Sequence, residues 1–194
     1  MGFKSAVVRF IRSRFGASKD LGKMAFGRNS GIDNDIKEKY GFDGELLRLF
    51  AANQGPPVHK WHHYIPLYDQ YFSRFRNSPV RFLEIGVFRG GSLQMWRKYF
   101  GDSAVIFGVD SDPACGELNG QSGQVRIGSQ DDPNFLEHVI DEMGGVDIVL
   151  DDGSHQAKHQ IDSFKFLFPR MSKGGIYMVE DLHTSFWRGY GGGY

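Results

Sequence analysis

The chain has 194 residues, of which 40% are hydrophobic and 24% are charged. This composition suits one folded domain of about 100–200 residues and excludes both two full domains and wholesale disorder. No stretch reaches the ~18 consecutive apolar residues that a membrane-spanning helix needs. The single cysteine, Cys115, excludes an internal disulfide and a cysteine-based zinc site. We therefore expect a cytoplasmic protein.

The charges balance overall, with 23 basic and 23 acidic residues, but they are unevenly distributed. Residues 1–28 carry seven basic residues and one acidic residue, so the rest of the chain has 16 basic and 22 acidic residues. A body with net negative charge gives no reason to expect a nucleic-acid partner.

The basic N-terminal stretch has apolar residues at every fourth position, namely Phe3, Val7, Ile11 and Phe15. This spacing predicts a short amphipathic helix over residues 1–15. Such a helix can lie on an anionic membrane surface, or dock on the protein itself or on a second subunit. We assign residues 1–44 to this helix and an irregular connector with at most short helices, and residues 45–194 to the folded domain.

From about residue 80 onward, apolar strand-like runs alternate with amphipathic helical segments. The expected strands are 80–85, 105–109, 125–127, 146–150 and 175–179, and the expected helices are 92–99, 133–143 and 156–168. Continuous apolar runs are typical of strands that are buried on both faces of a parallel sheet. The sequence therefore predicts a doubly wound, mainly parallel, Rossmann-like α/β fold.

A glycine-rich turn over residues 86–92 follows the first expected strand, at the end of the sheet where ligands bind in open α/β folds. Its glycines lack the G-x-G-x-x-G spacing of dinucleotide-binding proteins, which argues against a nicotinamide-dependent oxidoreductase. Glu84, two residues before Gly86, suits a ligand that carries an ammonium group. A tight strand-to-helix turn without a ligand is the alternative.

Polar residues also follow the second and third expected strands. Asp110 lies 24 residues after Gly86, close to the offset of about 20 residues at which an acidic side chain binds ribose hydroxyls. Ser129 and Gln130 offer groups that can contact an adenine edge, or they can belong to the start of the next helix. Together these positions indicate a cofactor that contains adenosine.

Four carboxylates and two histidines follow the fourth and fifth expected strands, in the stretches 151–155 and 180–183. Carboxylates that share a cleft repel one another unless a cation lies between them. Oxygen donors without thiolates favour a hard ion such as Mg²⁺, Mn²⁺ or Ca²⁺. His155, three residues after Asp152, is a candidate general base. A solvated acidic rim is the alternative.

Three stretches, 82–92, 151–155 and 179–185, resemble the class I S-adenosylmethionine-dependent methyltransferases, and within them the macrocin and mycinamicin type sugar O-methyltransferases. The resemblance extends from about His59 to Trp187. It implies S-adenosylmethionine as the cofactor, Mg²⁺ (or Mn²⁺) as the metal, and His155 as the base that deprotonates a sugar hydroxyl. The implied metal ligands are Asp152, Glu180 and Asp181. The implied cofactor-binding residues are Glu84, Gly86, Asp110, Ser129, Gln130 and Asp151.

The segment 59–68 is similar to one that these enzymes place over the cofactor, which adds Tyr64 to the cofactor site. An aromatic core helix is an equal alternative for this segment. The sheet of such enzymes continues for two strands beyond the fifth, whereas this chain stops fifteen residues after Val179. We therefore expect a domain that is incomplete at its C-terminus, or an edge covered by another subunit in a homo-oligomer.

The resemblance implies Mg²⁺-assisted methylation of a hydroxyl on a sugar or glycosylated metabolite, with a glycoside or glycolipid as the acceptor. A catalytically inactive, cofactor-binding scaffold of a biosynthetic complex is the alternative hypothesis.

Overall fold

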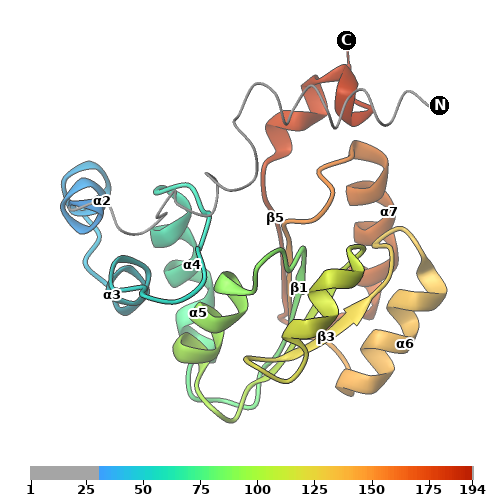
Figure 1. Ribbon diagram of the computed structural model, residues 1–194, viewed down its shortest axis with the longest axis horizontal. Helices are drawn as coiled ribbons and strands as arrows, with labels where there is room; N and C mark the ends of the chain where they lie inside the picture. The colour runs from blue at the N-terminus through green and yellow to red at the C-terminus, as the bar shows by residue number, and fades with distance from the viewer. Residues whose placement is uncertain (1–30, 194) are drawn as a thin grey trace.

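The computed structural model describes residues 31–193, and its centre is one sheet of five parallel strands (Figure 1). The strands are β1 (Arg81–Ile85), β2 (Val105–Asp110), β3 (Gln124–Ile127), β4 (Ile148–Asp151) and β5 (Ile176–Val179). Their order across the sheet is β3-β2-β1-β4-β5. The predicted strands and the predicted parallel α/β fold are confirmed. The helix predicted over residues 1–15 lies outside the described residues.

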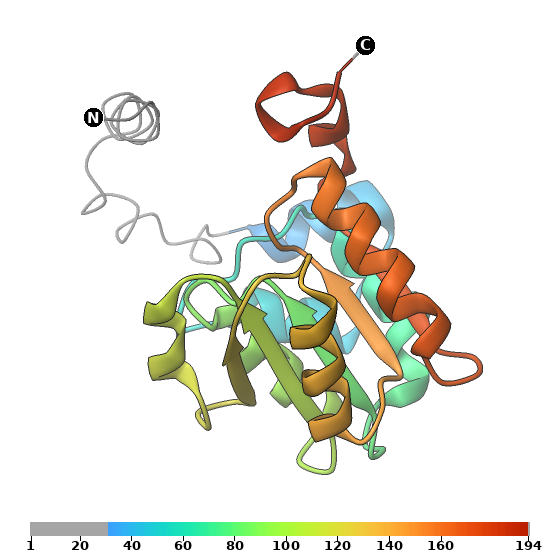
Figure 2. The same cartoon turned by 90° about the vertical axis from the view of Figure 1, so that its right-hand side faces the viewer.

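Helices cover both faces of the sheet (Figures 1 and 2). One face carries α2 (Ile32–Tyr40), α3 (Glu45–Ala51), α4 (Tyr64–Phe72) and α5 (Gly91–Phe100), and the other carries α6 (Pro133–Met143) and α7 (Ala157–Leu167). Short 3-10 turns are η1 (Ser73–Phe75), η2 (Pro113–Leu118), η3 (Phe168–Arg170), η4 (Leu182–Phe186) and η5 (Arg188–Tyr190). Within residues 31–193, every helix is too short or too polar to cross a membrane.

Local sequence signals set the ends of the helices. The Asp132 carboxylate accepts hydrogen bonds from the backbone N–H groups of Asn134 and Phe135, and Pro133 occupies the first turn, so α6 begins where a capping residue and proline direct it. The helix ends at Gly144, whose φ of 74° is in the left-handed region. The predicted helices over 92–99, 133–143 and 156–168 are confirmed as α5, α6 and α7.

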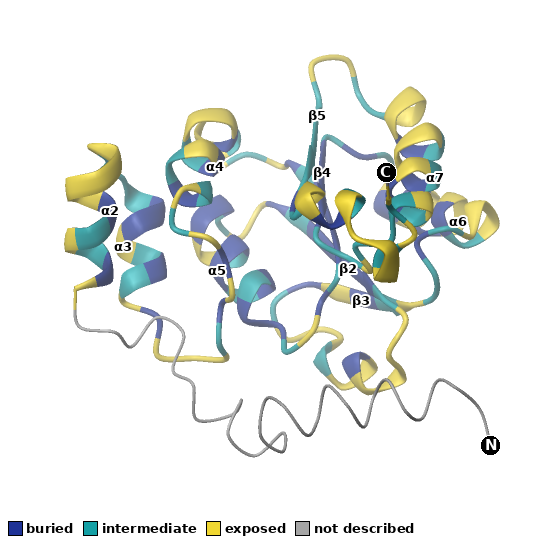
Figure 3. Cartoon of the chain, turned by 90° about the horizontal axis from the view of Figure 1, so that it is seen from above, coloured by how far each residue is buried: buried dark blue, intermediate teal, exposed yellow. Residues whose placement is uncertain are grey.

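Side chains alternate between the two faces of each strand, so the sheet has a core on either side. In β1, Phe82 packs with α4 and α5, where its ring centroid lies 5.3 Å from that of Trp96, whereas Leu83 packs with α6 and α7. Ile36 of α2 belongs to the Phe82 side, so part of the predicted connector is a helix in the core. Figure 3 shows the buried residues along the strands and the inner helix faces.

The chain changes direction across the sheet between β1 and β4, which makes their carboxyl ends a topological switch point. Ile85 lies opposite Asp151 in this register, so Gly86 and Asp152 are neighbours immediately beyond the strands. A Cβ atom on Gly86 would lie 2.1 Å from the Asp152 carbonyl oxygen, and its φ is 95°. Only glycine fits this position without a shift of the backbone.

Candidate active site

Two cavities lie along the carboxyl ends of the strands. The larger has a volume of about 900 Å³ and is lined by α2, by residues 59–63 and by the loops that follow β1, β2, β4 and β5. The smaller, of about 160 Å³, shares Gly86, Asp110 and Gly153 with it and extends to the loop after β3, where Ser129 and Gln130 line it. The two cavities therefore adjoin at the switch point, where ligands bind in this topology.

A buried lysine joins three acidic side chains at the wall of the larger cavity. Lys60 Nζ lies 2.6 Å from Asp152 Oδ2, 2.5 Å from Glu180 Oε1 and 3.7 Å from Glu84 Oε1. Burial alone would lower the pKa of Lys60, but the attraction of these carboxylates outweighs it and raises the pKa. One ammonium group thus faces three carboxylates from the ends of three different strands.

The same cluster holds three carboxyl groups around the single ammonium group of Lys60. Burial raises the pKa of Glu84 and of Glu180, against the attraction of Lys60. Glu84 also accepts a hydrogen bond from the Ser92 hydroxyl at 2.5 Å, but its Oε2 atom is buried without a hydrogen-bond partner among residues 31–193. Such a donor set has room for a further cation or for a ligand with a positive group.

Asp181 is held by donors from the segment before β1. Trp61 Nε1 donates to Asp181 Oδ1 at 2.9 Å, and the Tyr64 hydroxyl donates to the same oxygen at 3.1 Å. The Tyr64 oxygen also accepts from the Asp181 backbone N–H at 3.1 Å. The structure therefore places Tyr64, a predicted cofactor residue, against a predicted metal ligand.

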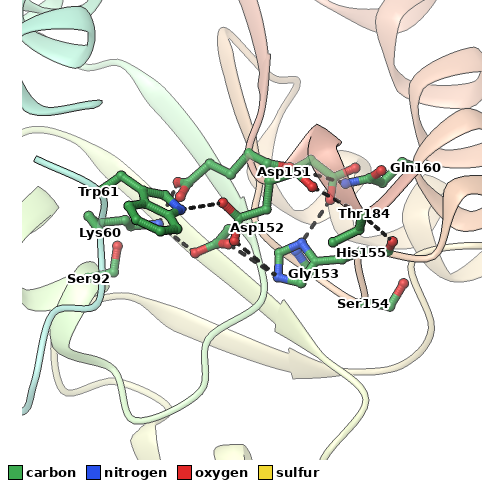
Figure 4. A network of polar contacts seen from close by, with 12 residues as sticks. Lys60, Trp61, Ser92, Asp151, Asp152, Gly153, Ser154, His155, Gln160 and Thr184 are labelled. Carbon is green, nitrogen blue, oxygen red and sulfur yellow. Dashed lines mark hydrogen bonds and ion pairs between the residues drawn. The ribbon is translucent and has the colours of Figure 1, made fainter. Parts of the chain in front are cut away.

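His155 lies between Asp152 and Asp181. Figure 4 shows Lys60 and Trp61 on one side of Asp152 and His155 on the other. His155 Nε2 is 3.7 Å from Asp152 Oδ1 and 3.9 Å from Asp181 Oδ2. Asp152, His155 and Asp181 each offer one atom to a group whose members lie within 4.8 Å of one another. This spacing, with two carboxylates, fits a hard divalent ion.

His155 and Asp181 both have a left-handed backbone conformation, and hydrogen bonds from Thr184 hold them in it. His155 has a φ of 55° and Asp181 a φ of 53°, a left-handed conformation that is uncommon for residues other than glycine. The Thr184 hydroxyl lies 2.9 Å from the His155 carbonyl oxygen and 3.0 Å from that of Asp181, and its one proton is shared between these two acceptors. One side chain therefore ties the two loops together and supports both strained residues.

Asp110 at the end of β2 holds the glycine-rich turn. Its Oδ2 accepts from the backbone N–H groups of Val87 and Phe88 at 2.9 and 3.0 Å, and its Oδ1 accepts from Asp112. Burial by itself would raise the pKa of Asp110, but these three donors outweigh it and lower the pKa. Asp110 lines both cavities, and ribose binding by this residue stays a prediction.

Asp151 is fully buried and lies behind Gln130, which lines the smaller cavity. Its carboxylate accepts from Gln130 Nε2 at 3.1 Å and from the Ser163 hydroxyl at 2.9 Å. Gln130 Oε1 in turn accepts from the Ser154 backbone N–H at 2.8 Å. The structure thus brings Gln130 to the cavity wall and places Asp151 behind it, where it braces the loop that carries His155.

Lys60 and Trp61 are the site residues that the sequence reasoning missed. Their partners lie far away in the chain, with a separation of 92 positions from Lys60 to Asp152 and of 120 from Trp61 to Asp181. A lysine within an aromatic stretch, at residues 59–64, was the only signal. Hydrophobic periodicity does not show that such a lysine is buried.

The fold and the acidic site at its switch point define a Rossmann-like methyltransferase domain. A family model described as "Methyltransferase domain" matches residues 83–182, just over half of the chain. The chain belongs to this family.

Two curated relatives are similar over most of the chain. The 8-demethyl-8-(2-methoxy-alpha-L-rhamnosyl)-tetracenomycin-C 3'-O-methyltransferase of Streptomyces olivaceus is 46% identical over 156 residues, which cover 77% of this chain and 40% of the relative. The mycinamicin VI 2''-O-methyltransferase of Micromonospora griseorubida is 41% identical over 157 residues, which cover 76% of this chain and 38% of the relative. The chain therefore spans about two fifths of the length of these relatives.

A solved structure is also similar. It is the MycE methyltransferase from the mycinamycin biosynthetic pathway in complex with Mg, SAH and mycinamycin VI. The match has a TM-score of 0.66 at 30% identity and covers all of this chain and 48% of that one. The predicted resemblance to sugar O-methyltransferases of this type is confirmed.

Proposed function

We propose that this chain forms the cofactor- and metal-binding part of an S-adenosylmethionine-dependent O-methyltransferase that acts on a sugar hydroxyl of a glycosylated small molecule. The observation that carries the proposal is the convergence of Asp152, His155 and Asp181 within 4.8 Å beside a cavity of about 900 Å³. Membership of the methyltransferase family supports the reaction type. The activities for which the two relatives are named support a sugar as the acceptor.

The two adjoining cavities suit the parts of S-adenosylmethionine. The ribose would lie at Asp110, whose oxygens retain lone pairs for hydroxyl donors, and the adenine would lie in the smaller cavity beside Ser129 and Gln130. The absence of a side chain at Gly86 lets the cofactor approach the backbone where the cavities meet. Glu84 lies buried below this point, 3.7 Å from Lys60 Nζ, and its role in cofactor binding stays a prediction.

The acidic cluster suits Mg²⁺ or Mn²⁺, and Asp152, Glu180 and Asp181 are the residues that would hold it. Such an ion supplies a Lewis acid that lowers the pKa of an acceptor hydroxyl. His155 would accept the hydroxyl proton at Nε2. This nitrogen lies 3.7 Å from an Asp152 oxygen and 3.9 Å from an Asp181 oxygen, so the base would stand next to the ion-binding carboxylates.

Methyl transfer to a panel of glycosides tests the proposal. The full chain would be incubated with S-adenosylmethionine labelled in its methyl group, with Mg²⁺ or with EDTA, and the products identified by mass spectrometry. We expect transfer that EDTA abolishes and Mg²⁺ restores, together with binding of S-adenosylhomocysteine in calorimetry. Binding without transfer to any glycoside would favour the inactive scaffold, and absence of binding would contradict the proposal.

Two further expectations about partners stay predictions. Sedimentation velocity tests the homo-oligomer, and binding to vesicles that contain anionic lipid tests a membrane contact through residues 1–15.

A further inference from the structure

We propose that Lys60 is a positioning residue of the divalent-ion site, whose ammonium group holds Asp152 and Glu180 in the arrangement that the ion requires. The inference rests on the proposed function, because that proposal supplies the ion. Lys60 is not one of the predicted metal ligands, and its effect on the affinity for the ion can be measured without catalysis.

Lys60 links side chains from three adjacent strands. Its side chain is 1% exposed, and its Nζ lies 2.6 Å from Asp152 and 2.5 Å from Glu180. These two residues follow β4 and β5, and Glu84, 3.7 Å away, lies in β1. A single cation therefore sets the separation of these carboxylates.

Donors from residues 60–64 occupy one oxygen of each predicted metal ligand. Lys60 donates to Asp152 Oδ2 and to Glu180 Oε1. Trp61 and Tyr64 both donate to Asp181 Oδ1. The second oxygens of the two aspartates, Asp152 Oδ1 and Asp181 Oδ2, are the ones nearest His155 Nε2. The segment thus orients each aspartate so that its other oxygen faces His155. We call Asp152, His155 and Asp181, whose ligand atoms lie within 4.8 Å of one another, the convergent group.

Lys60 lies on the buried side of this arrangement, and the convergent group lies on the accessible side. The side chains of Asp152, His155 and Asp181 are 21%, 23% and 25% exposed, compared with 1% for Lys60. The aspartates are therefore more accessible to an ion than the ammonium group, although Lys60 also lines the cavity. This placement favours a supporting role for Lys60 over competition with the ion for the same oxygens.

The test is the affinity of the chain for Mn²⁺, measured by electron paramagnetic resonance or calorimetry without cofactor or acceptor. Lys60→Met keeps an unbranched side chain, one atom shorter, and removes its charge. Because loss of a partner that orients metal ligands costs about 10–100-fold in affinity, we expect a loss of this size. Lys158→Met is the matched control: Lys158 is 78% exposed and pairs with Asp162 on the surface of α7, so the affinity of this variant should be unchanged.

Equal or tighter Mn²⁺ binding by Lys60→Met would overturn the inference, because it would show that Lys60 is neutral toward the ion or competes with it. A wild-type chain that binds no Mn²⁺ would contradict the metal part of the proposed function as well, so the two failures are distinguishable.

Two further variants keep the test decisive if Lys60→Met does not fold. Lys60→Met/Glu84→Gln removes one buried negative charge together with the cation, and circular dichroism and thermal unfolding would confirm its fold. Trp61→Phe removes a donor to Asp181 at an exposed ring, 57% accessible, and leaves Lys60 in place. We expect weaker Mn²⁺ binding in both, with the larger loss in the double variant, and wild-type affinity in both would overturn the inference.

Discussion

Strands β1 and β4 carry a group of charged side chains at each end, and the two groups differ in how well their charges are matched. At the amino ends, Arg81 pairs with Asp147, one charge against one. At the carboxyl ends, Lys60 faces Glu84, Asp152 and Glu180. The strands and their spacing are the same, so the contrast comes from the side chains alone.

The charged groups at the amino ends are fully paired with one another and with neighbouring polar atoms. Arg81 Nε lies 3.0 Å from Asp147 Oδ2, and Nη2 lies 2.7 Å from Asp147 Oδ1 and 2.7 Å from Ser172 Oγ. The Arg81 guanidinium also donates to the Gly144 carbonyl oxygen, and the Arg81 backbone N–H donates to Asp147 Oδ2. A bidentate pair with these partners stabilises the register of β1 and β4 and leaves no charge for a ligand.

The group at the carboxyl ends is open. It has three carboxyl groups around one ammonium group, a Glu84 oxygen that lacks a hydrogen-bond partner among the described residues, and two left-handed residues, His155 and Asp181. Unmatched charge and backbone strain are retained where they serve a function. We therefore expect one end of the sheet to contribute stability and the other to contribute binding and chemistry, and substitutions should separate the two.

The largest effect is expected from His155→Asn. Asparagine tolerates the left-handed backbone of this position but does not accept a proton near neutral pH, so methyl transfer should fall about 100–10,000-fold. The free energy of unfolding should change by less than about 1 kcal/mol. Turnover assays and urea denaturation measure the two quantities. His138→Asn, an exposed change on α6, is the control, and full activity in His155→Asn would remove histidine from the mechanism.

Arg81→Met should show the opposite pattern. The substitution leaves the Asp147 carboxylate half-buried without its partner, which should cost about 2–3 kcal/mol in the free energy of unfolding. Activity per folded molecule should stay close to that of the wild type. Urea denaturation provides the measurement. Lys37→Met, which breaks an exposed pair with Asp43, should cost less than about 1 kcal/mol, and equal losses in the two variants would refute the contrast.

The pH dependence of stability follows from the same pair. The Arg81 guanidinium, helped by Ser172, lowers the pKa of Asp147 from its ordinary value of 3.8 to about 2. Because this folded-state pKa is depressed, the stabilisation is complete above about pH 4 and is lost as the pH falls toward about 2, a difference of about 2 kcal/mol. Urea unfolding of the wild type and Arg81→Met across this acidic range should show the gap between them shrink with acid. A constant gap would contradict this explanation.

The smallest effect is expected from Ser172→Ala. It removes one hydrogen bond to Arg81, at 2.7 Å, and should cost about 1 kcal/mol in the free energy of unfolding. The same urea measurement applies. In the Arg81→Met background the substitution should cost less, because the contact of Ser172 with Arg81 is already gone. A cost equal to that of Arg81→Met would show that the serine, and not the ion pair, holds the strands together.

The strands and most of the candidate site could be predicted because their signals are local. Apolar runs such as 80–85 and 105–109 are long enough to identify buried strands, and the residues that follow them must lie at one edge of a parallel sheet. Asp152 and Asp181 are therefore expected side by side from the order of the segments. Helix α2 was harder to predict from the sequence, because its nine residues lie among glycines and charges. Its buried residues are only Ile32 and Ile36.

Chain order alone therefore specified a parallel α/β sheet and the set of acidic residues at its edge, because strand and helix periodicities are properties of short segments. The packing of distant segments specified the arrangement of that set: Lys60 between Asp152 and Glu180, Trp61 and Tyr64 on Asp181, and Asp151 behind Gln130. Buried charges find their partners through space, and the free energy of such contacts depends on burial and distance, which no local pattern encodes.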